Sequence, residues 1–330
     1  MITVLLAAWN GALYIEEQLD SILKQTVPVN RIVVSDDGST DGTRDVLERY
    51  ARAYPEQVML RNRSQERKEK DIKDGIPAAA GNFFWLLSGE CAVESDYVML
   101  SDQDDVWKPE KVSVHLEEMK RLEEKYGTDH PILVHSDMEV VDANLKTIHP
   151  SFFQYQNCDP SRVSFAELLA ENSVTGGAVM MNRALASLLK ERPAAWFMHD
   201  WWIALAASCF GTISGVKTPL YLYRQHDRNT LGAKESGSVK ALAGRLERSR
   251  QVEENYRRMA AQAHAFGKMY EHRMSEEQKA ILRAYLALRY QSPVGRLKNI
   301  LKNRFYKNSK IQTLAQCVTI PRPDGGNWPV

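Results

Sequence analysis

The stretch "YVMLSDQDDVW", residues 97–107, places an apolar run directly before three aspartates, Asp102, Asp104 and Asp105. Such an apolar run is typical of a buried strand. Carboxylates this close together repel one another, which raises the pKa of at least one of them unless a cation is present. Three uses of the cluster are therefore open: binding of a divalent metal, acid–base catalysis, or capping of the next helix by Asp105.

The composition is that of an ordinary globular protein. The chain has 330 residues, of which 44% are hydrophobic and 26% charged, and its net charge is +1. This balance argues against nucleic acid as a partner. Its four cysteines lie far apart without a C-x-x-C spacing, which is typical of free thiols in a reducing compartment. Because the sequence shows no basic leader and no long apolar segment, we expect a cytoplasmic protein.

Apolar segments alternate with helical patterns through the first part of the chain. Segments 2–8, 31–37 and 96–102 are typical of buried strands, and apolar residues at helical spacing recur between them. This order predicts an α/β fold with a Rossmann-like, mainly parallel central sheet flanked by helices. Between residues 63 and 75 the density of charge predicts a mobile loop.

Several polar residues follow directly after the predicted strands. Asn10, the pair Asp36–Asp37 and the cluster around Asp102 each stand at such a position. Parallel strands bring their carboxyl ends to one edge of the sheet, where ligands bind in folds of this class. We therefore expect these residues to meet at that edge, and their number favours a functional site over a simple helix cap.

The later part of the chain continues this pattern and then changes. Segment 173–183 predicts a strand entered through Gly176 and Gly177, and a helix is expected to begin near Asp200. Segment 211–226 predicts two short strands. Beyond about residue 232 the pattern becomes helical, charged and amphipathic, which predicts a helical C-terminal extension.

Binding of a divalent metal would explain why the three aspartates lie so close together. Hard cations such as Mg²⁺ and Mn²⁺ prefer carboxylate oxygens and usually bridge to substrate phosphates. A D-x-D sequence on a tight turn can aim two carboxylates at one ion, so a diphosphate substrate is expected. The sequence contains no G-x-x-x-x-G-K-[ST] motif, and no G-x-G-x-x-G follows the first strand. The sequence therefore argues against a P-loop and against a dinucleotide-binding fold.

Six segments in order resemble a known family. They are "VLLAAWNGALYIEEQLDSIL", "RIVVSDDGSTDGT", "YVMLSDQDDVW", "NSVTGGAVMMNR", "MHDWWIALAASCFG" and "LYLYRQHDRNTLG". Together they resemble the family-2 glycosyltransferases with a GT-A fold, and within them the rhamnosyltransferase-like branch of bacterial cell-surface polysaccharide synthesis. The resemblance covers residues 1–232, which would form the catalytic domain, and leaves 233–330 as a helical region.

The resemblance implies inverting transfer of a sugar from a nucleotide-diphosphate donor, with Mn²⁺ or Mg²⁺ as cofactor. It implies that Trp9 and Asn10 border the base and that Asp36 or Asp37 accepts the N3–H of uracil or thymine. Asp102 would lie near the ribose and the metal, Asp104 and His226 would bind the metal, and Asp200 would be the general base. Further substrate contacts are expected from Ala8, Asn82, Gly176, Gly177, His199, Trp201, Trp202 and Arg224.

Each of these roles has a plainer alternative. Asp36 could cap only the turn "DDGSTDG", and His226 could be a hydrogen-bonded structural histidine. His199 is expected to orient or support rather than to catalyse. On the helix that begins near Asp200, one of Trp201 and Trp202 should face the core, while the other is free to stack on a sugar ring.

The segment 291–310 carries six positive residues and no acid, with apolar residues interleaved at helical spacing. A basic amphipathic helix of this kind can lie on an anionic membrane surface, or its apolar face can pack on the catalytic domain. Contact with the membrane would suit a glycan or polyprenyl-diphosphate-linked acceptor, which the resemblance implies, and would make the protein peripheral at the inner face of the plasma membrane.

Two other functions compete with sugar transfer. A sugar-1-phosphate nucleotidyltransferase also joins a nucleotide, a metal and a sugar, but "AAWNGALY" lacks the arginine and the glycine pair of the loop expected there. A non-catalytic glycan-binding protein of the same fold would need neither Asp200 nor the acid cluster.

Overall fold

The structure is a computed structural model that describes residues 1–226 and 245–322. A nine-stranded sheet forms its centre, with the order β3-β2-β1-β4-β8-β6-β9-β5 and with β7 paired to β6. The strands are β1 (Ile2–Ala8), β2 (Arg31–Asp36), β3 (Val58–Arg61), β4 (Tyr97–Ser101), β5 (Val106–Trp107), β6 (Ile132–Val141), β7 (Thr147–His149), β8 (Val179–Asn182) and β9 (Thr212–Arg224). Strands β1 to β4 are parallel, and β6 is parallel to β9, whereas β8 runs antiparallel to both of its neighbours.

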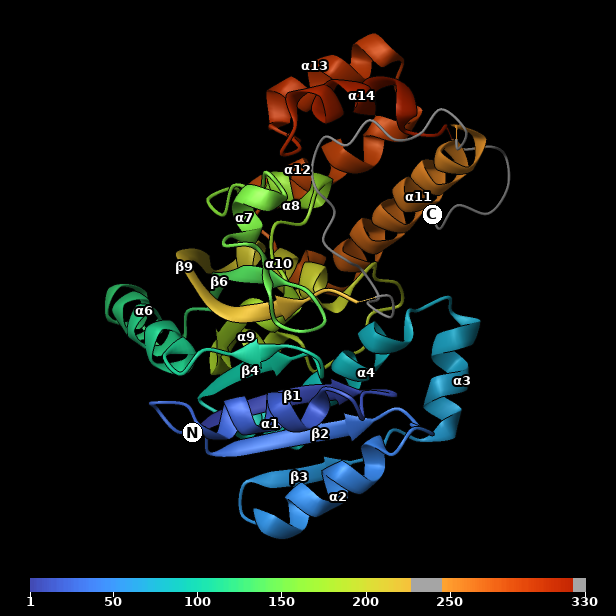
Figure 1. Cartoon of the computed structure of the whole chain (residues 1–330). Coiled ribbons are helices and arrows are strands. Elements are labelled where there is room, and N and C mark those ends of the chain that lie inside the picture. Colours follow the sequence, from blue (N-terminus) through green and yellow to red (C-terminus); the bar gives the residue numbers. More distant parts are fainter. Residues whose placement is uncertain (227–244, 323–330) are drawn as a thin grey trace.

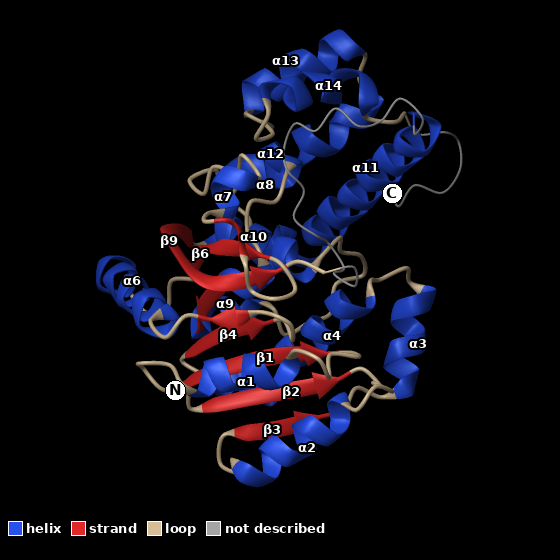
Figure 2. Ribbon diagram, viewed as in Figure 1, coloured by secondary structure: helices blue, strands red, loops and turns tan. Residues whose placement is uncertain are grey.

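Helices cover both faces of this sheet (Figures 1 and 2). They are α1 (Ile15–Leu23), α2 (Thr43–Ala53), α3 (Gln65–Lys73), α4 (Ala78–Leu87), α5 (Glu90–Glu94), α6 (Lys111–Tyr126), α7 (Phe152–Tyr155), α8 (Phe165–Ala170), α9 (Arg183–Leu188), α10 (His199–Phe210), α11 (Arg245–Tyr270), α12 (Glu276–Ala287), α13 (Pro293–Asn303) and α14 (Lys310–Thr319). Three short 3₁₀ segments accompany them: η1 (Gly176–Ala178), η2 (Glu271–Arg273) and η3 (Leu288–Tyr290). The predicted α/β architecture with a helical C-terminal extension is confirmed.

The central strands are apolar throughout because both of their faces are buried. In β1, Val4 and Leu6 point to one face, where they belong to a buried cluster with Ile15 of α1 and Val112 of α6. Leu5 points to the other face and belongs to a second cluster, which includes residues of α4, α9 and α10. Successive side chains of a strand alternate between the faces, so a continuous apolar run supplies both cores.

Residues 63–75, which we predicted to be a mobile loop, instead contain the helix α3. Ser64 caps this helix by accepting a hydrogen bond from the backbone N–H of Arg67. The Arg63 guanidinium is buried between the carboxylates of Asp37 and Asp71. The prediction was wrong because the charges of this segment form ion pairs with one another and with distant residues, and these pairs hold the segment in place.

The segment 211–226 is also different from the prediction, because it forms the single strand β9 rather than two. This strand runs parallel to β6, and the register between them shifts beside Asp137, opposite the stretch that contains Pro219. A bulge of this kind accommodates a proline, which lacks a backbone N–H, without ending the strand. The sequence break that suggested two strands is therefore a local irregularity in one.

The C-terminal helices share a core with the sheet. Phe266 of α11 and Ile300 of α13 belong to the same buried cluster as Leu5 of β1. The boundary between residues 232 and 233 that we predicted for the catalytic domain lies outside the described residues. Within the described ranges, no helix combines the length and the apolar character that a bilayer span requires.

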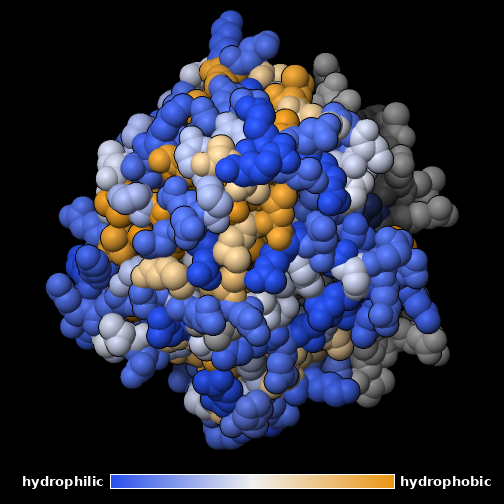
Figure 3. Space-filling model, turned by 90° about the horizontal axis from the view of Figure 1, so that it is seen from below, coloured by the Kyte–Doolittle hydropathy of each residue, from blue (hydrophilic) through white to orange (hydrophobic). Residues whose placement is uncertain are grey.

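The arrangement of layers leaves α13 and α14 at the opposite end of the molecule from α2 and β3 (Figure 1). The face seen from below, on the side of α2 and β3, is mostly hydrophilic, and apolar side chains appear on it in small groups (Figure 3).

Candidate active site

The carboxyl ends of the parallel strands line a cavity of about 1270 Å³. Loops that follow β1, β4 and β9 contribute to it, as does the start of α10. Strand β8 runs in the opposite direction, so its beginning lies at the same edge and brings Gly176 to the cavity. Twelve of the predicted site residues line it: Ala8, Trp9, Asn10, Asp37, Asn82, Asp102, Asp104, Gly176, His199, Asp200, Trp201 and His226.

The three aspartates that follow β4 point in different directions. Asp102 faces the cavity, whereas Asp105 is 1% exposed and accepts a hydrogen bond from the backbone N–H of Arg224. Glu110, not Asp105, occupies the N-cap of α6, so Asp105 does not cap that helix as one alternative supposed. Burial, together with the charges of Asp104 and Asp200, raises the pKa of Asp102 to about 7.

A buried cation lies beneath this cluster. The Lys111 side chain is fully buried, and its Nζ donates a 2.5 Å hydrogen bond to the carbonyl oxygen of Gly177. The same Nζ lies 3.7 Å from the centre of the Trp107 ring and 4.2 Å from that of Tyr221. Burial lowers the pKa of Lys111, while the charges of Asp105 and Asp102 oppose that shift. Lys111 thus offsets part of the repulsion among the aspartates.

Asp104 and His226 form a pair at the cavity wall. The His226 Nε2 lies 2.9 Å from the Asp104 Oδ2, and the imidazole stacks on the Tyr14 ring with 4.9 Å between ring centres. We predicted a metal site of three residues, including Asp102. No group of three histidine, cysteine or acidic side chains suited to a metal occurs in the described ranges. Of the three predicted ligands, Asp104 and His226 contact one another, and a metal role for Asp102 stays a prediction.

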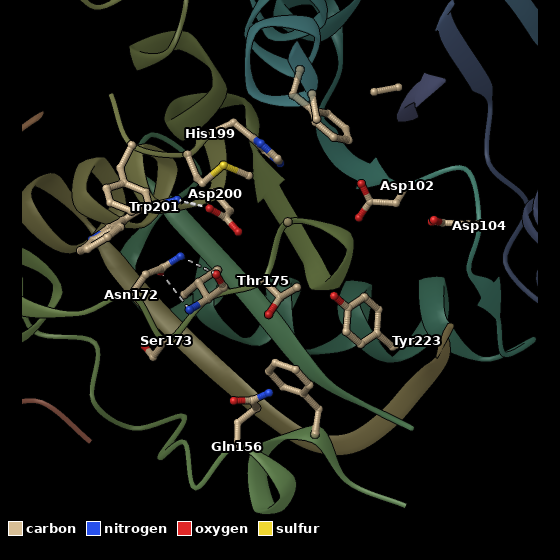
Figure 4. Close-up of a pocket in the computed structure, with 18 of the residues that line it drawn as sticks. Asp102, Asp104, Gln156, Asn172, Ser173, Thr175, His199, Asp200, Trp201 and Tyr223 are labelled. Atoms are coloured by element: carbon tan, nitrogen blue, oxygen red, sulfur yellow. Dashed lines mark hydrogen bonds between the residues drawn. The ribbon is translucent and has the colours of Figure 1, made fainter. Parts of the chain in front are cut away.

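Asp200 lies at the first turn of α10, on the opposite wall of the cavity. Its carboxylate and that of Asp102 point toward one another (Figure 4). The Asp200 Oδ1 accepts a 2.6 Å hydrogen bond from the backbone N–H of Trp201. Burial raises the pKa of Asp200 to about 6, although hydrogen bonds from the backbone favour the ionised form. A carboxylate with this pKa is ionised at neutral pH and can still accept a proton readily.

His199 is buried beside Asp200 and faces the same cavity (Figure 4). Its ring stacks on Phe83 with 4.1 Å between centres, and within the described residues neither ring nitrogen has a hydrogen-bond partner. Burial lowers the pKa of His199 to about 3, so the ring is neutral. A Cβ on Gly176 would lie 2.5 Å from the His199 Nε2, so only glycine leaves room for this ring.

Hydrogen bonds between loops hold the part of the cavity wall that follows β1 and β2. Trp9 is 60% exposed at the mouth, and its backbone N–H and carbonyl both bond to the Gln103 side-chain amide. Asn10 has a φ of 48°, and its side-chain oxygen accepts a hydrogen bond from the backbone N–H of Thr40. These bonds tie the loop after β1 to the acid cluster on one side and to the turn after β2 on the other.

The neighbours Asp36 and Asp37 have separate roles. Asp36 accepts hydrogen bonds from the backbone N–H and the hydroxyl of Ser39, so it holds the turn, as one alternative supposed. Asp37 lines the cavity and pairs with Arg63 and Lys68 at 2.7 and 3.3 Å. Of the two, only Asp37 reaches the place where a ligand would bind.

Three further predicted residues do not line the cavity. Gly177 lies behind Asp102, because a Cβ there would be 3.3 Å from the Asp102 Oδ2. Trp202 is fully buried in the core beside Phe266. Arg224 is 3% exposed and donates to Glu17 and to the Asp104 carbonyl oxygen, so it supports the loop of the acid cluster.

The two tryptophans of α10 differ less in burial than we predicted. Trp201 is also largely buried, at 7% exposed, although it does reach the cavity. Its indole N–H donates to the Leu168 carbonyl oxygen, which fixes the ring in place.

Sequence reasoning did not find Lys111, Gln103 or Tyr14. Lys111 and His115 lie on the buried face of α6 with Met119, at spacings of four residues. Two polar residues within an apolar stripe are the signal that could have identified Lys111. Gln103 stands inside the D-Q-D motif and Tyr14 directly precedes α1, but their contacts depend on loops that meet only in the folded chain.

Comparison with known proteins identifies the family to which the chain belongs. A family model described as glycosyl transferase family 2 matches residues 3–186. An uncharacterized glycosyltransferase of a Nostoc species is 28% identical over 69% of this chain, which spans just under two thirds (66%) of that relative. The dTDP-rhamnosyl transferase RfbG of Shigella flexneri is 26% identical over 71% of this chain and 76% of its own length.

The crystal structure of S. aureus TarS residues 1–349 with UDP-GlcNAc has a TM-score of 0.53 to this structure at 17% identity, covering 91% of this chain and 72% of that one. This likeness confirms the predicted GT-A fold. Because the family model covers more than half of the chain, the protein belongs to glycosyl transferase family 2 and is a glycosyltransferase.

Proposed function

We propose that this enzyme transfers a sugar from a nucleotide-diphosphate donor to an acceptor hydroxyl with inversion at the anomeric carbon. One observation carries the proposal: Asp200 faces Asp102 and the Asp104–His226 pair across a single cavity. A base on one wall and a set of metal-binding groups on the other leave room for a reacting carbon between them. Residues 1–232 would form the catalytic domain.

The Asp104–His226 pair fits a divalent cation of the Mn²⁺ or Mg²⁺ type. Such ions are commonly bound through one or two protein groups, while substrate phosphates and water complete the shell. When bound, the ion would neutralise charge on the diphosphate leaving group. Tyr14 stacks on His226 and Arg224 supports the Asp104 loop, so both groups are held in place before the donor arrives.

The base of the donor would lie between Trp9 and Asp37. The exposed Trp9 ring offers a surface for stacking, and the Asp37 carboxylate can accept the N3–H of uracil or thymine. A dTDP-rhamnose donor is favoured by the resemblance and by the relative named dTDP-rhamnosyl transferase. UDP-hexoses are the alternative, since both bases present the same N3–H group.

The chemical step follows from the position of Asp200. Its carboxylate takes the proton of the acceptor hydroxyl while that oxygen forms a bond to the anomeric carbon. The bond from that carbon to the diphosphate oxygen breaks on the opposite face, and its electron pair leaves with the diphosphate. His199, neutral and without a partner in the described residues, is placed to bond a sugar hydroxyl.

A thermal-shift screen of nucleotide sugars with Mn²⁺ or Mg²⁺, followed by assay of donor hydrolysis, tests the proposal. We expect a dTDP- or UDP-sugar to raise the melting temperature only with metal, and Asp104→Ala to remove that shift. Binding without donor turnover would indicate a non-catalytic glycan-binding protein. Formation of a nucleotide sugar from sugar 1-phosphate would indicate the nucleotidyltransferase.

The acceptor we propose is a glycan or a lipid-linked glycan met at the inner membrane surface. In segment 291–310, Ile300 and Phe305 are buried and Arg296 is only 3% exposed, whereas Leu301 is 53% exposed, so only part of the predicted apolar stripe packs inward. The exposed surface of α13 and α14 comprises Val294, Leu301, Ile311, Leu314 and Val318, with Lys298, Lys302 and Lys310 among them. Flotation with anionic liposomes, with and without Leu314→Glu, would test contact through this surface.

A further inference from the structure

A second cavity, of about 1120 Å³, lies between the segment that contains α7 and the pair α13 and α14. It adjoins the catalytic cavity, because Asn157, Cys158, Lys307 and Asn308 line both. The two cavities therefore lie next to each other at these residues, and Asp200 lines the catalytic one.

The lining of the second cavity is rich in cations. Four of them contribute to it: Arg162, Lys217, Lys307 and Lys310. Two acids also line it, but both have hydrogen-bond donors of their own: Asp137 accepts from the Ser151 hydroxyl and the Phe153 backbone, and Asp159 accepts from Ser161. Arg162 is engaged with Glu167 and with the Lys307 carbonyl oxygen. The charge of Lys217 acts on Asp159, which leaves Lys307 and Lys310 to attract an anion.

Lys307 stands where the two cavities join. Burial lowers the pKa of its ammonium group, while the charge of Glu171 opposes the shift. The Nζ lies 5.3 Å from the centre of the Tyr256 ring, and within the described residues no carboxylate comes within ion-pairing distance of it. A desolvated cation without a paired anion is costly, and a bound anion would offset that cost.

Apolar side chains continue the lining beyond the lysines. Leu301 of α13 and Leu314 of α14 lie at the cavity and are 53% and 57% exposed. Tyr306 and Phe153 add aromatic surface. The cavity thus combines Lys307, at the junction with the catalytic cavity, with half-exposed apolar side chains, and the ligand that matches it is an anion carrying an apolar chain.

We propose that the second cavity binds the acceptor, through a phosphate group held at Lys307 and an apolar chain laid against Leu301 and Leu314. The sugar of the acceptor would then extend into the catalytic cavity and present its hydroxyl to Asp200. This inference rests on the proposed function and names the acceptor class as a lipid phosphate. The diphosphate of the donor is not the ligand here, since its partners Asp104 and His226 are absent from this lining.

Calorimetric titration of the full chain with farnesyl diphosphate, in EDTA to prevent metal-dependent binding at Asp104, tests the inference. We expect farnesyl diphosphate to bind more tightly than either inorganic diphosphate or farnesol. Lys307→Met should weaken that binding about tenfold or more, as expected for loss of a charged hydrogen bond. Lys302→Met removes an exposed cation of α13 outside the cavity and should leave it unchanged.

A second pair of variants addresses the apolar rim without risk to the core. Leu314→Glu should weaken binding of farnesyl diphosphate, whereas Ile311→Glu, on the same helix but outside the lining, should not. Equal affinities for Lys307→Met and Lys302→Met, or farnesol binding as tightly as farnesyl diphosphate, would overturn the inference. A lower melting temperature of Lys307→Met with unchanged binding of farnesyl diphosphate would show that Lys307 has a structural role, and would also overturn the inference.

The donor assay separates this inference from the proposed function. If metal-dependent nucleotide binding and donor turnover are present but farnesyl diphosphate does not bind, only the acceptor assignment fails. If nucleotide binding is absent as well, the proposed function itself fails.

Discussion

Replacing Asp200 with asparagine should separate activity from stability. The side chain keeps its size and one oxygen that can accept the hydrogen bond from the Trp201 N–H, but it can no longer take a proton. Loss of a general base typically lowers a rate by about 10²- to 10⁴-fold. We therefore expect sugar transfer to fall by about that factor, while binding of the donor persists because Asp200 lies on the opposite wall from the proposed metal ligands.

The same substitution should stabilise the fold. Burial raises the pKa of Asp200 from 3.8 to about 6, so the folded state resists its ionisation, at a cost of about 3 kcal/mol at neutral pH. For a pKa raised on folding, stability is complete below about pH 4 and is lost as the pH rises through about 6. Asparagine cannot ionise, so the variant does not lose this stability. Its melting temperature should equal that of the wild type near pH 4 and exceed it increasingly toward pH 7.

The assay combines product formation with thermal unfolding across this pH range. In the wild type, the transfer rate should fall as the pH drops below about 6, because Asp200 becomes protonated. Asp45→Asn, at an exposed position in the first turn of α2, is the control and should change neither property appreciably. Near-normal turnover in Asp200→Asn would refute the assignment of the base, and a lower melting temperature at pH 7 would refute the account of its burial.

Three other substitutions probe the parts that position the site. Gly176→Ala would place a Cβ 2.5 Å from the His199 Nε2; we expect a loss of about 1–3 kcal/mol in unfolding free energy together with lower transfer, and unchanged kinetics would contradict this. Arg63→Met leaves the buried carboxylate of Asp37 without its closest partner, so denaturant titration should show a loss of about 3 kcal/mol, and nucleotide affinity should fall as well. Arg224→Met removes support from the loop of the acid cluster and should weaken metal-dependent UDP binding about 10- to 100-fold; equal weakening in EDTA would argue against an effect through the metal.

Local patterns were sufficient to predict much of the sheet. Strands β1, β2 and β4 are buried on both faces, which requires an unbroken apolar run that is visible in the sequence. The end of such a run marks the edge of the sheet, so the polar residues that follow, such as Asn10 and Asp102, could be assigned to one edge without a structure.

Long-range pairing explains the elements that were not predicted. Helix α3 is rich in charge and resembles a loop, but Asp71 on it pairs with Arg63 and with Arg192, which is 121 positions away. The basic segment 291–310 resembles a membrane helix, yet Arg296 turns inward and donates to the backbone carbonyl of Leu288. Arg296 also donates to the carbonyl oxygen of Cys317, 21 positions away. The distant partners Arg192 and Cys317 lie outside any window that a local pattern covers.

The sequence by itself determined where the buried strands end and which polar residues follow them. Burial of a parallel sheet restricts its strands to apolar residues, so the first polar residues after an apolar run mark the end of a strand. Only the tertiary structure decided which acids share the cavity. Consecutive residues of a strand or turn point in different directions, so Asp37 reaches the cavity while Asp36 holds the turn. Asp200 joins them from 98 positions beyond Asp102 because β8 and α10 fold back to the same edge.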